Sequence, residues 1–245
     1  MLKFENLSVF YGKKQVLFDI SASIKRGKFT AIIGRNGSGK STLLSALTSQ
    51  IAYSGKILLD GRDISSIDRR ERAKMISFLP QNLPATQFTV GETVAFGREP
   101  HISFRLTESD LEIIENSLEK CGISHLRDKK LTDISGGERQ MAYLSMMLAQ
   151  DADLMLLDEP TTYMDAPNAR DFLKILAEER DRGKSVAAVM HDLTGAVKFA
   201  DNIILIDRGN LIFAGTRDGA LSSGIIESTM GVQMYALEDG TVIFV

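Results

Sequence analysis

A glycine-rich segment narrows the possible folds of this chain more than any other part of its sequence. It runs Gly34-Arg35-Asn36-Gly37-Ser38-Gly39-Lys40-Ser41 and matches the phosphate-binding loop pattern, in which a glycine and four further residues precede Gly-Lys-Ser. A short apolar strand is predicted before it, at 29–33, and a helix after it, at 41–52. Glycines let the backbone wrap around a phosphate chain, so that amide groups and the helix N-terminus face the anion. The segment therefore predicts a phosphate site, and a glycine-rich turn without a ligand is the less favoured alternative.

Two side chains of this segment have predicted roles of their own. Lys40 would reach the β and γ phosphates of a nucleotide, and the Ser41 hydroxyl would bind Mg²⁺. The expected nucleotide contacts in and directly after the segment are Gly34, Asn36, Gly37, Ser38, Gly39, Lys40, Ser41 and Thr42.

The composition is that of an ordinary soluble domain, because 44% of the 245 residues are hydrophobic and 25% are charged. No apolar run approaches the ~18 residues that a membrane helix needs, and the charged N-terminus predicts no secretion signal. The single cysteine, Cys121, suits a reducing compartment. A net charge of −3 gives no electrostatic footprint for nucleic acid. We therefore expect a cytosolic protein, with any contact to a membrane made through a partner.

The N-terminal residues 1–30 alternate short apolar runs with turn residues. This alternation predicts half-buried antiparallel strands ahead of the phosphate-binding loop. The runs are 2–5 and 7–10, and Tyr11 ends the second of them. An aromatic ring there would stack on an adenine, although a surface tyrosine in a turn fits the spacing equally well.

Polar residues follow three predicted core strands. Gln81 follows the strand at 76–79, the pair Asp158-Glu159 ends the buried strand that begins at Leu154, and His191 follows the strand at 185–190. Side chains at the carboxyl ends of parallel strands gather at one edge of a sheet. A carboxylate pair at that place in a phosphate-loop protein predicts metal and water binding. His191 alone would be structural, but beside the others it is a predicted γ-phosphate contact.

A second anion site is predicted where Ser135-Gly136-Gly137 opens a helix that runs to about Gln150. Ser135, Gly136 and Gly137 are expected to present free amides and the serine hydroxyl at the helix N-terminus, which favours a negative ligand. The residues between 82 and about 121 change from loop-rich sequence to a helix at 108–120, which we interpret as a helical insertion within one domain. A helix at 169–182, a hairpin at 203–213 and a turn at 238–240 complete the predicted elements.

Taken in order, these motifs resemble those of the ABC-type ATPases over essentially the whole chain. The matching features are the phosphate-binding loop, Gln81, Ser135-Gly136-Gly137, Asp158-Glu159, Asp165 and His191. The resemblance implies an α/β fold of the P-loop NTPase type, with a mostly parallel central sheet, an N-terminal antiparallel β subdomain and an inserted helical subdomain. It also implies one ATPase domain over 1–245, with about 82–150 as the helical subdomain that contains the signature motif.

The resemblance further implies ATP and Mg²⁺ as cofactors and a role for each matching side chain. Tyr11 matches the aromatic residue that stacks on adenine. The positions that match Mg²⁺ contacts are Ser41, Gln81 and Asp158. The positions that match catalytic residues are Glu159, which polarises the attacking water, His191, which contacts the γ-phosphate, and Gln81, which reports to a membrane partner. The positions that match contacts between two copies are Ser135, Gly136 and Gly137, on the nucleotide of the other copy, and Asp165.

Two departures from the family pattern are visible. The signature usually reads Leu-Ser-Gly-Gly-Gln, whereas Ile134 and Glu138 stand at its ends here. Isoleucine keeps the apolar anchor, but Glu138 adds a charge. The passage 161–165 also differs from the more usual Ser-Ala-Leu-Asp ending, although Asp165 is retained.

Within the family, 94–101 and 148–151 resemble the ATPase subunits of ferric-siderophore, haem and vitamin B12 importers, and the closing segment through 239–240 is compatible with them. The resemblance implies a second copy of the chain, permease subunits and, indirectly, a substrate-binding protein as partners, at the cytoplasmic face of the membrane. We expect a permease to dock on 81–105, where the large apolar residues are Leu83, Phe88, Phe96 and Phe104; filling of the insertion's core is the alternative. An iron–sulfur-assembly ATPase and the ATPase of an exporter remain open as other functions.

Overall fold

The central sheet places the phosphate-binding loop in the middle of the protein. The computed structural model describes residues 1–237 and 241–245, and the turn expected at 238–240 lies outside them. Six strands form this sheet in the order β10-β9-β3-β8-β7-β6. All neighbours pair in parallel except β9 and β10, which form the predicted hairpin. The prediction of a mostly parallel sheet is thus confirmed.

The described strands are β1 (Leu2–Tyr11), β2 (Lys14–Ile24), β3 (Phe29–Ile33), β4 (Ser54–Leu59), β5 (Arg62–Asp63), β6 (Ile76–Leu79), β7 (Leu154–Asp158), β8 (Ser185–Val189), β9 (Asn202–Asp207), β10 (Asn210–Thr216), β11 (Met234–Ala236) and β12 (Val242–Phe244). The α-helices are α1 (Lys40–Leu47), α2 (Arg69–Met75), α3 (Val90–Ala95), α4 (Glu108–Lys120), α5 (Gly136–Gln150), α6 (Ala166–Asp181), α7 (Leu193–Phe199), α8 (Arg217–Ser222) and α9 (Ile225–Met230). None of these helices is both long and apolar enough to cross a membrane.

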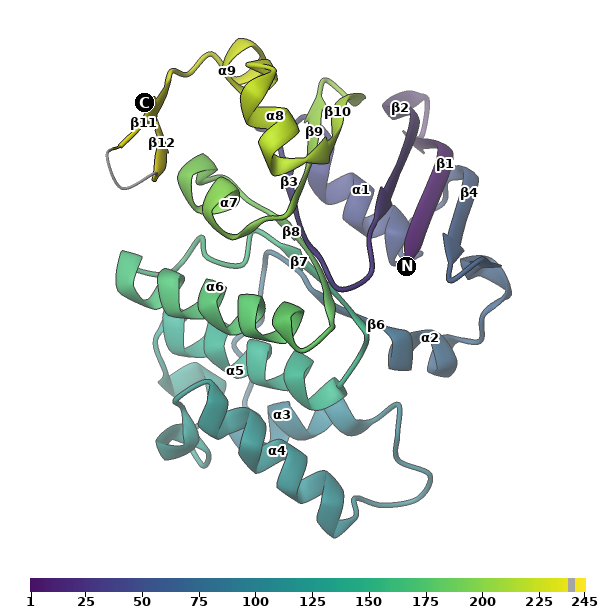
Figure 1. Ribbon diagram of the computed structural model, residues 1–245. Coiled ribbons are helices and arrows are strands. Elements are labelled where there is room, and N and C mark those ends of the chain that lie inside the picture. The colour runs from purple at the N-terminus through teal and green to yellow at the C-terminus, as the bar shows by residue number, and fades with distance from the viewer. Residues whose placement is uncertain (238–240) are drawn as a thin grey trace.

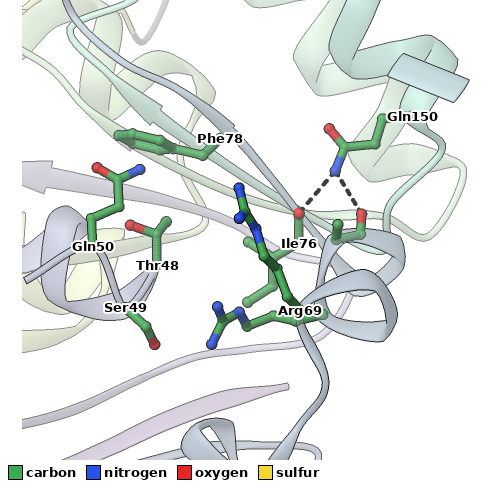
Figure 2. A pocket seen from close by; sticks show the side chains of 9 residues that line it. Thr48, Ser49, Gln50, Arg69, Ile76, Phe78 and Gln150 are labelled. Carbon is green, nitrogen blue, oxygen red and sulfur yellow. Dashed lines mark hydrogen bonds between the residues drawn. The ribbon is translucent and has the colours of Figure 1, made fainter. Parts of the chain in front are cut away.

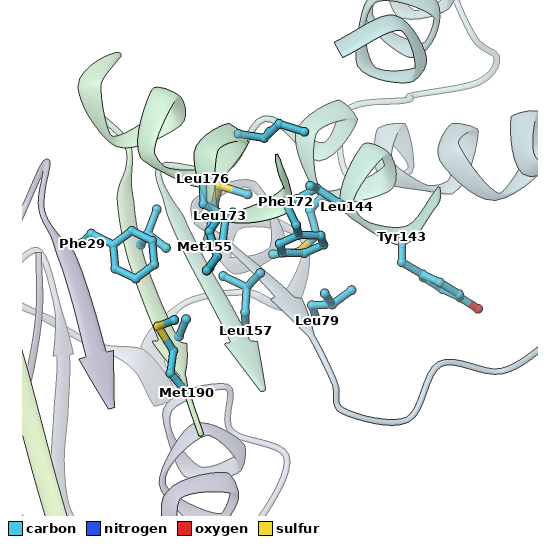
Figure 3. Close-up of a cluster of buried hydrophobic side chains, with 14 of the residues drawn as sticks. Phe29, Leu79, Tyr143, Leu144, Met155, Leu157, Phe172, Leu173, Leu176 and Met190 are labelled. Atoms are coloured by element: carbon cyan, nitrogen blue, oxygen red, sulfur yellow. The ribbon is translucent and has the colours of Figure 1, made fainter. Parts of the chain in front are cut away.

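Two apolar cores lie on opposite faces of the central sheet, because successive side chains of a strand point to opposite sides. On β3, Ile32 packs into the core shared with α1 and the N-terminal sheet, which is antiparallel in the order β2-β1-β4-β5. Phe29 and Ile33 pack into the other core, with α5, α6 and α7. Figure 3 shows this second core, where Phe172 of α6 lies beside Leu157 of β7. Every residue of β3 is therefore buried.

The helices between β6 and β7 gather at one end of the molecule. In Figure 1, α3 and α4 lie beyond α5, away from the C-terminal hairpin of β11 and β12. Thr107 caps α4 through a reciprocal pair of hydrogen bonds with Asp110, which also accepts a hydrogen bond from Arg98 at 2.9 Å. The α4 helix has the predicted bounds, 108–120.

Several predicted boundaries are wrong for local reasons. The helix after the phosphate-binding loop ends at Leu47 rather than 52, because Thr48 turns its hydroxyl to the Leu44 carbonyl at 3.0 Å and Ser49 has a positive φ of 57°. The runs 2–5 and 7–10 belong to one strand, β1, with a bulge at Asn6, where φ is 48°. Helices α3, α7, α8 and α9 were not predicted.

Candidate active site

The phosphate-binding loop connects β3 to α1 and needs glycine at two crowded positions. A Cβ on Gly34, whose φ is 151°, would lie 2.0 Å from the Ile206 carbonyl oxygen, and one on Gly39 would lie 2.5 Å from Leu17. The loop is also held from outside, since the Gly209 N–H donates to the Ser38 carbonyl at 2.9 Å. The Leu17 side chain of β2, the Ile206 carbonyl of β9 and Gly209 of the β9–β10 turn therefore lie close against the loop and limit its shape.

Lys40 lies inside the loop. Its ammonium donates hydrogen bonds to the carbonyl oxygens of Gly34, at 2.9 Å, and Arg35, at 3.0 Å. The residue is 4% exposed, and this burial lowers the pKa of its ammonium, while the carboxylates of Glu159 and Asp158 act in the opposite direction. A cation held at the centre of a ring of backbone groups is suited to a phosphate chain.

Ser41 and Asp158 bring two oxygen ligands together. The Ser41 hydroxyl donates to Asp158 Oδ1 at 3.1 Å. Burial raises the pKa of the Asp158 carboxyl, and the Ser41 hydrogen bond opposes the shift. No cluster of three His, Cys, Asp or Glu side chains that could cage a metal occurs in residues 1–237 and 241–245. One hydroxyl and one carboxylate suit Mg²⁺, which usually takes few protein ligands and completes its shell with phosphate and water.

Glu159 is the centre of a second group at the end of β7. Its Oε2 accepts a hydrogen bond from the Gln81 side chain at 2.6 Å, and its Oε1 contacts Nε2 of His191. Gln81 follows β6 and His191 follows β8, the two neighbours of β7 in the sheet. Glu159 has a positive φ of 50°, uncommon for a residue other than glycine. Such conformations often occur at functional sites, and here this one occurs where three predicted site residues meet.

These groups surround one cavity of about 390 Å³. Its lining residues are Val16, Asn36, Gly37, Gly39, Lys40, Ser41, Thr42, Gln81, Glu159 and His191. Asp158 borders it through Ser41. Val16 of β2 was missed by the sequence analysis, because no motif marks it and it reaches the cavity only through the packing of β2 against the loop. Ser38 is 3% exposed and lies beneath the loop rather than on the cavity wall.

The remaining predicted site residues do not line this cavity. Tyr11 is half exposed at the end of β1. Ser135 and Gly137, at the start of α5, line a different cavity of about 750 Å³. Gly136 lies next to Tyr163. Asp165 caps α6, where its side chain accepts a hydrogen bond from the Asn168 N–H at 2.9 Å. One chain therefore carries two separate groups of predicted nucleotide contacts.

The expectation of a free Ser135 amide is wrong. The Ser135 N–H donates to the Glu138 carboxylate at 2.7 Å, and the Glu138 N–H donates to the Ser135 hydroxyl at 3.2 Å. This reciprocal pair is a capping box, which satisfies two donors of the first helical turn. The Glu138 carboxylate therefore occupies part of the predicted anion site.

The amino-acid sequence matches a family model described as ABC transporter over residues 17–162. The chain is 38% identical over 243 residues to the ferric enterobactin transport ATP-binding protein FepC of Escherichia coli (strain K12), with 97% of this chain and 90% of that one covered. It is 36% identical over 230 residues to the petrobactin import ATP-binding protein YclP of Bacillus subtilis (strain 168), with 93% and 91% covered.

The fold agrees with these matches. It is similar to the ADP conformation of MJ1267, an ATP-binding cassette of an ABC transporter, with a TM-score of 0.81, 25% sequence identity and coverage of 94% of this chain and 98% of that one. The chain belongs to the ABC transporter family, as an ATP-binding cassette that binds nucleotide and hydrolyses ATP to drive transport.

Proposed function

We propose that this chain, as one ATPase domain over 1–245 with a helical subdomain at about 82–150, powers the import of a ferric siderophore or a related iron complex. The observation that carries the proposal is that FepC and YclP, both named for the transport of such compounds, align with the chain over nearly their whole lengths. An iron–sulfur-assembly ATPase or an exporter subunit has less support, because neither of these two relatives is named for iron–sulfur assembly or for export.

The proposed mechanism divides the work among the residues around the cavity. Lys40 and the loop amides would hold the β and γ phosphates, while Ser41, Asp158 and Gln81 would hold Mg²⁺. When bound, Mg²⁺ offsets negative charge on the phosphate oxygens. Glu159 orients the attacking water and accepts its proton. To do so, its carboxylate must give up its contact with Gln81 or His191 and contact the water instead. Phosphoryl transfer depends mainly on such positioning and charge stabilisation.

The second group of contacts belongs, in this proposal, to a neighbouring copy. Ser135, Gly136 and Gly137 would contact the nucleotide held by the other chain, with Asp165 close to the twofold axis and Tyr11 stacked on the adenine. The separation of the two groups into different cavities supports this assignment. Twofold symmetry then produces two equivalent sites at one interface.

Uptake measurements test the proposed transport. A strain that lacks this chain should lose accumulation of radioactive iron from ferric siderophores, and reintroduction of the chain should restore it. The Glu159→Gln variant, which should bind ATP without hydrolysing it at a useful rate, should fail to restore iron accumulation. Normal iron accumulation in the deletion strain, together with a defect in iron–sulfur enzymes or in efflux, would instead identify one of the alternative functions.

A pocket beside α2 supports a docking site for the permease at the cytoplasmic face of the membrane. Its volume is about 550 Å³, and it lies between the end of α1, the α2 helix and β6. Figure 2 shows this pocket, whose lining includes Arg69, Thr48, Ser49 and Phe78. Neither Arg69 nor Arg72, which also lines it, forms an ion pair within the described part of the chain. Two unpaired guanidinium groups beside an aromatic ring suit an acidic, partly apolar segment of a partner.

The segment 81–105 continues this surface. Arg70 donates hydrogen bonds to the carbonyls of Pro100, at 2.9 Å, and Ile102, so the loop that contains these two residues is held against α2. Phe104 in this loop is 96% exposed, and Phe88 and Phe96 are about half exposed with their rings in edge contact. Leu83 instead packs against the core, as expected if the apolar residues of this segment fill the core of the helical insertion. We propose that a cytoplasmic loop of the permease covers Phe104 and reaches the two arginines.

Charge reversal in this pocket should uncouple the chain from its permease. We expect the Arg69→Glu/Arg72→Glu variant to reduce iron uptake at least about tenfold, since like charges across an interface oppose binding, while ATP hydrolysis by the isolated subunit stays near normal. The matched control is Lys74→Glu, on the same helix but outside the pocket. Equal uptake by the two variants, each with near-normal ATP hydrolysis, would place the docking surface elsewhere.

A further inference from the structure

The N-terminus of α5 carries a negative charge where the usual family signature has none. Glu138 accepts the Ser135 N–H and donates its own N–H to the Ser135 hydroxyl, as described above. A glutamine makes the same two hydrogen bonds, because the capping box accepts either residue. The hydrogen bonds therefore account for the length of the side chain but not for its charge.

The charge of Glu138 persists at neutral pH. The hydrogen bond from the Ser135 backbone is the first cause that lowers the pKa of this carboxyl below its ordinary value. No Lys, Arg or His of the described residues lies within ion-pair distance of the carboxylate, and Lys129 and His125 act on it only through longer-range attraction. The group is thus ionised and has no direct counter-charge.

Glu138 also faces the surface that the proposed function assigns to a second copy. Ser135, Gly137 and Glu138 line the same cavity, so any phosphate that approaches the first two also approaches the carboxylate. The Gly136 and Gly137 amides and the helix dipole attract an anion there, whereas Glu138 opposes it.

The lysines of this cavity do not cancel the charge of Glu138, because each is already paired. Lys120 contacts Glu179 and lies 3.6 Å from Glu178, and Lys174 lies 2.8 Å from Asp171. A nucleotide that enters this surface therefore meets the carboxylate without compensation from these two lysines, and the attraction of Lys129 and His125 acts on Glu138 only from longer range.

We propose that Glu138 weakens, by charge repulsion, the contact between this surface and the nucleotide carried by a second copy, and so sets the ATP concentration at which two copies close. The inference rests on the head-to-tail dimer of the proposed function. Its consequence is regulatory: closure requires more ATP, and the closed dimer separates more readily. The side chain is partly exposed, so the effect is modest, about fivefold to tenfold in ATP concentration.

Titration of dimer formation tests this inference. The Glu159→Gln chain is used throughout, so that hydrolysis does not remove the dimer, and the dimer fraction is measured by analytical ultracentrifugation against ATP concentration. Adding Glu138→Gln should lower the midpoint about fivefold to tenfold. The difference should shrink at high salt, where screening shortens the range of charge interactions from ~10 Å at 0.1 M to ~3 Å at 1 M.

The matched control is Glu92→Gln. Glu92 forms the same capping box with Thr89 at the start of α3 but does not line this cavity. The ATP concentration at the midpoint of dimer formation should therefore be the same for Glu92→Gln as for the parent. Glu138→Ala removes both the charge and the cap; it should lower the midpoint as Glu138→Gln does, while also lowering thermal stability. An unchanged midpoint for Glu138→Gln, or a shift insensitive to salt, overturns the inference. A parent chain that never dimerises with ATP overturns both the inference and the proposed dimer.

Discussion

Replacement of Glu159 by glutamine is expected to slow ATP hydrolysis by about two to four orders of magnitude, the range for a positioned general base. Glutamine keeps the shape of the side chain but cannot take a proton from water. ATP binding should persist, because Lys40 and the loop amides are unchanged. Because the bound ATP is hydrolysed so slowly, the closed dimer should persist and accumulate with ATP bound. Phosphate release measures the rate, and size-exclusion chromatography with ATP, with and without Mg²⁺, measures the dimer.

A second carboxylate provides the control for this experiment. Glu112 is exposed on α4, and its change to glutamine should leave both rate and assembly at the parent values. Near-normal phosphate release by Glu159→Gln would contradict the role proposed for Glu159, as would a monomer under both nucleotide conditions.

Replacement of Lys40 by alanine is expected to abolish tight ATP binding. Hydrogen bonds to charged groups contribute about 1.5–3 kcal/mol each, so loss of the contacts to two phosphates should raise the dissociation constant at least about 100-fold. The variant also loses the hydrogen bonds that Lys40 donates to the Gly34 and Arg35 carbonyls. The loop should nevertheless stay close to its shape, since its approaches to Leu17, Ile206 and Gly209 are made by other residues. Titration calorimetry measures the affinity.

Arg35 offers a matched control within the same loop. Its side chain is exposed and does not line the cavity, so Arg35→Ala should bind ATP nearly as the parent does. Equal affinity for Lys40→Ala and the parent would exclude this loop as the triphosphate site.

Much of the central site was predictable because it depends on parallel strands. Gln81, Glu159 and His191 are far apart in sequence, but each follows a buried strand, and such strand ends meet at one edge of a sheet. The structure places the three within contact distance. Their individual catalytic roles remain predictions, which the variants above test.

The features that sequence analysis missed depend on side chains that satisfy backbone groups locally. Thr48 ends α1 early by bonding to a carbonyl of the preceding turn, which a helical pattern of apolar residues does not reveal. Glu138 likewise accepts a hydrogen bond from the Ser135 N–H, which the sequence analysis did not predict, although the spacing of a capping box is present in the sequence. Val16 lines the cavity through tertiary packing alone.

The contact between Gly209 and Ser38 bears on how the protein is made. The phosphate-binding loop leaves the ribosome early, but the β9–β10 turn that donates to it follows about 170 residues later, or roughly 10–30 s of synthesis. Both neighbours of β3 in the sheet, β8 and β9, also emerge late. The nascent chain therefore carries the loop's sequence long before it can hold the loop's shape. We therefore expect competence to bind ATP to arise near the end of translation, when most of the polypeptide is already available to fold.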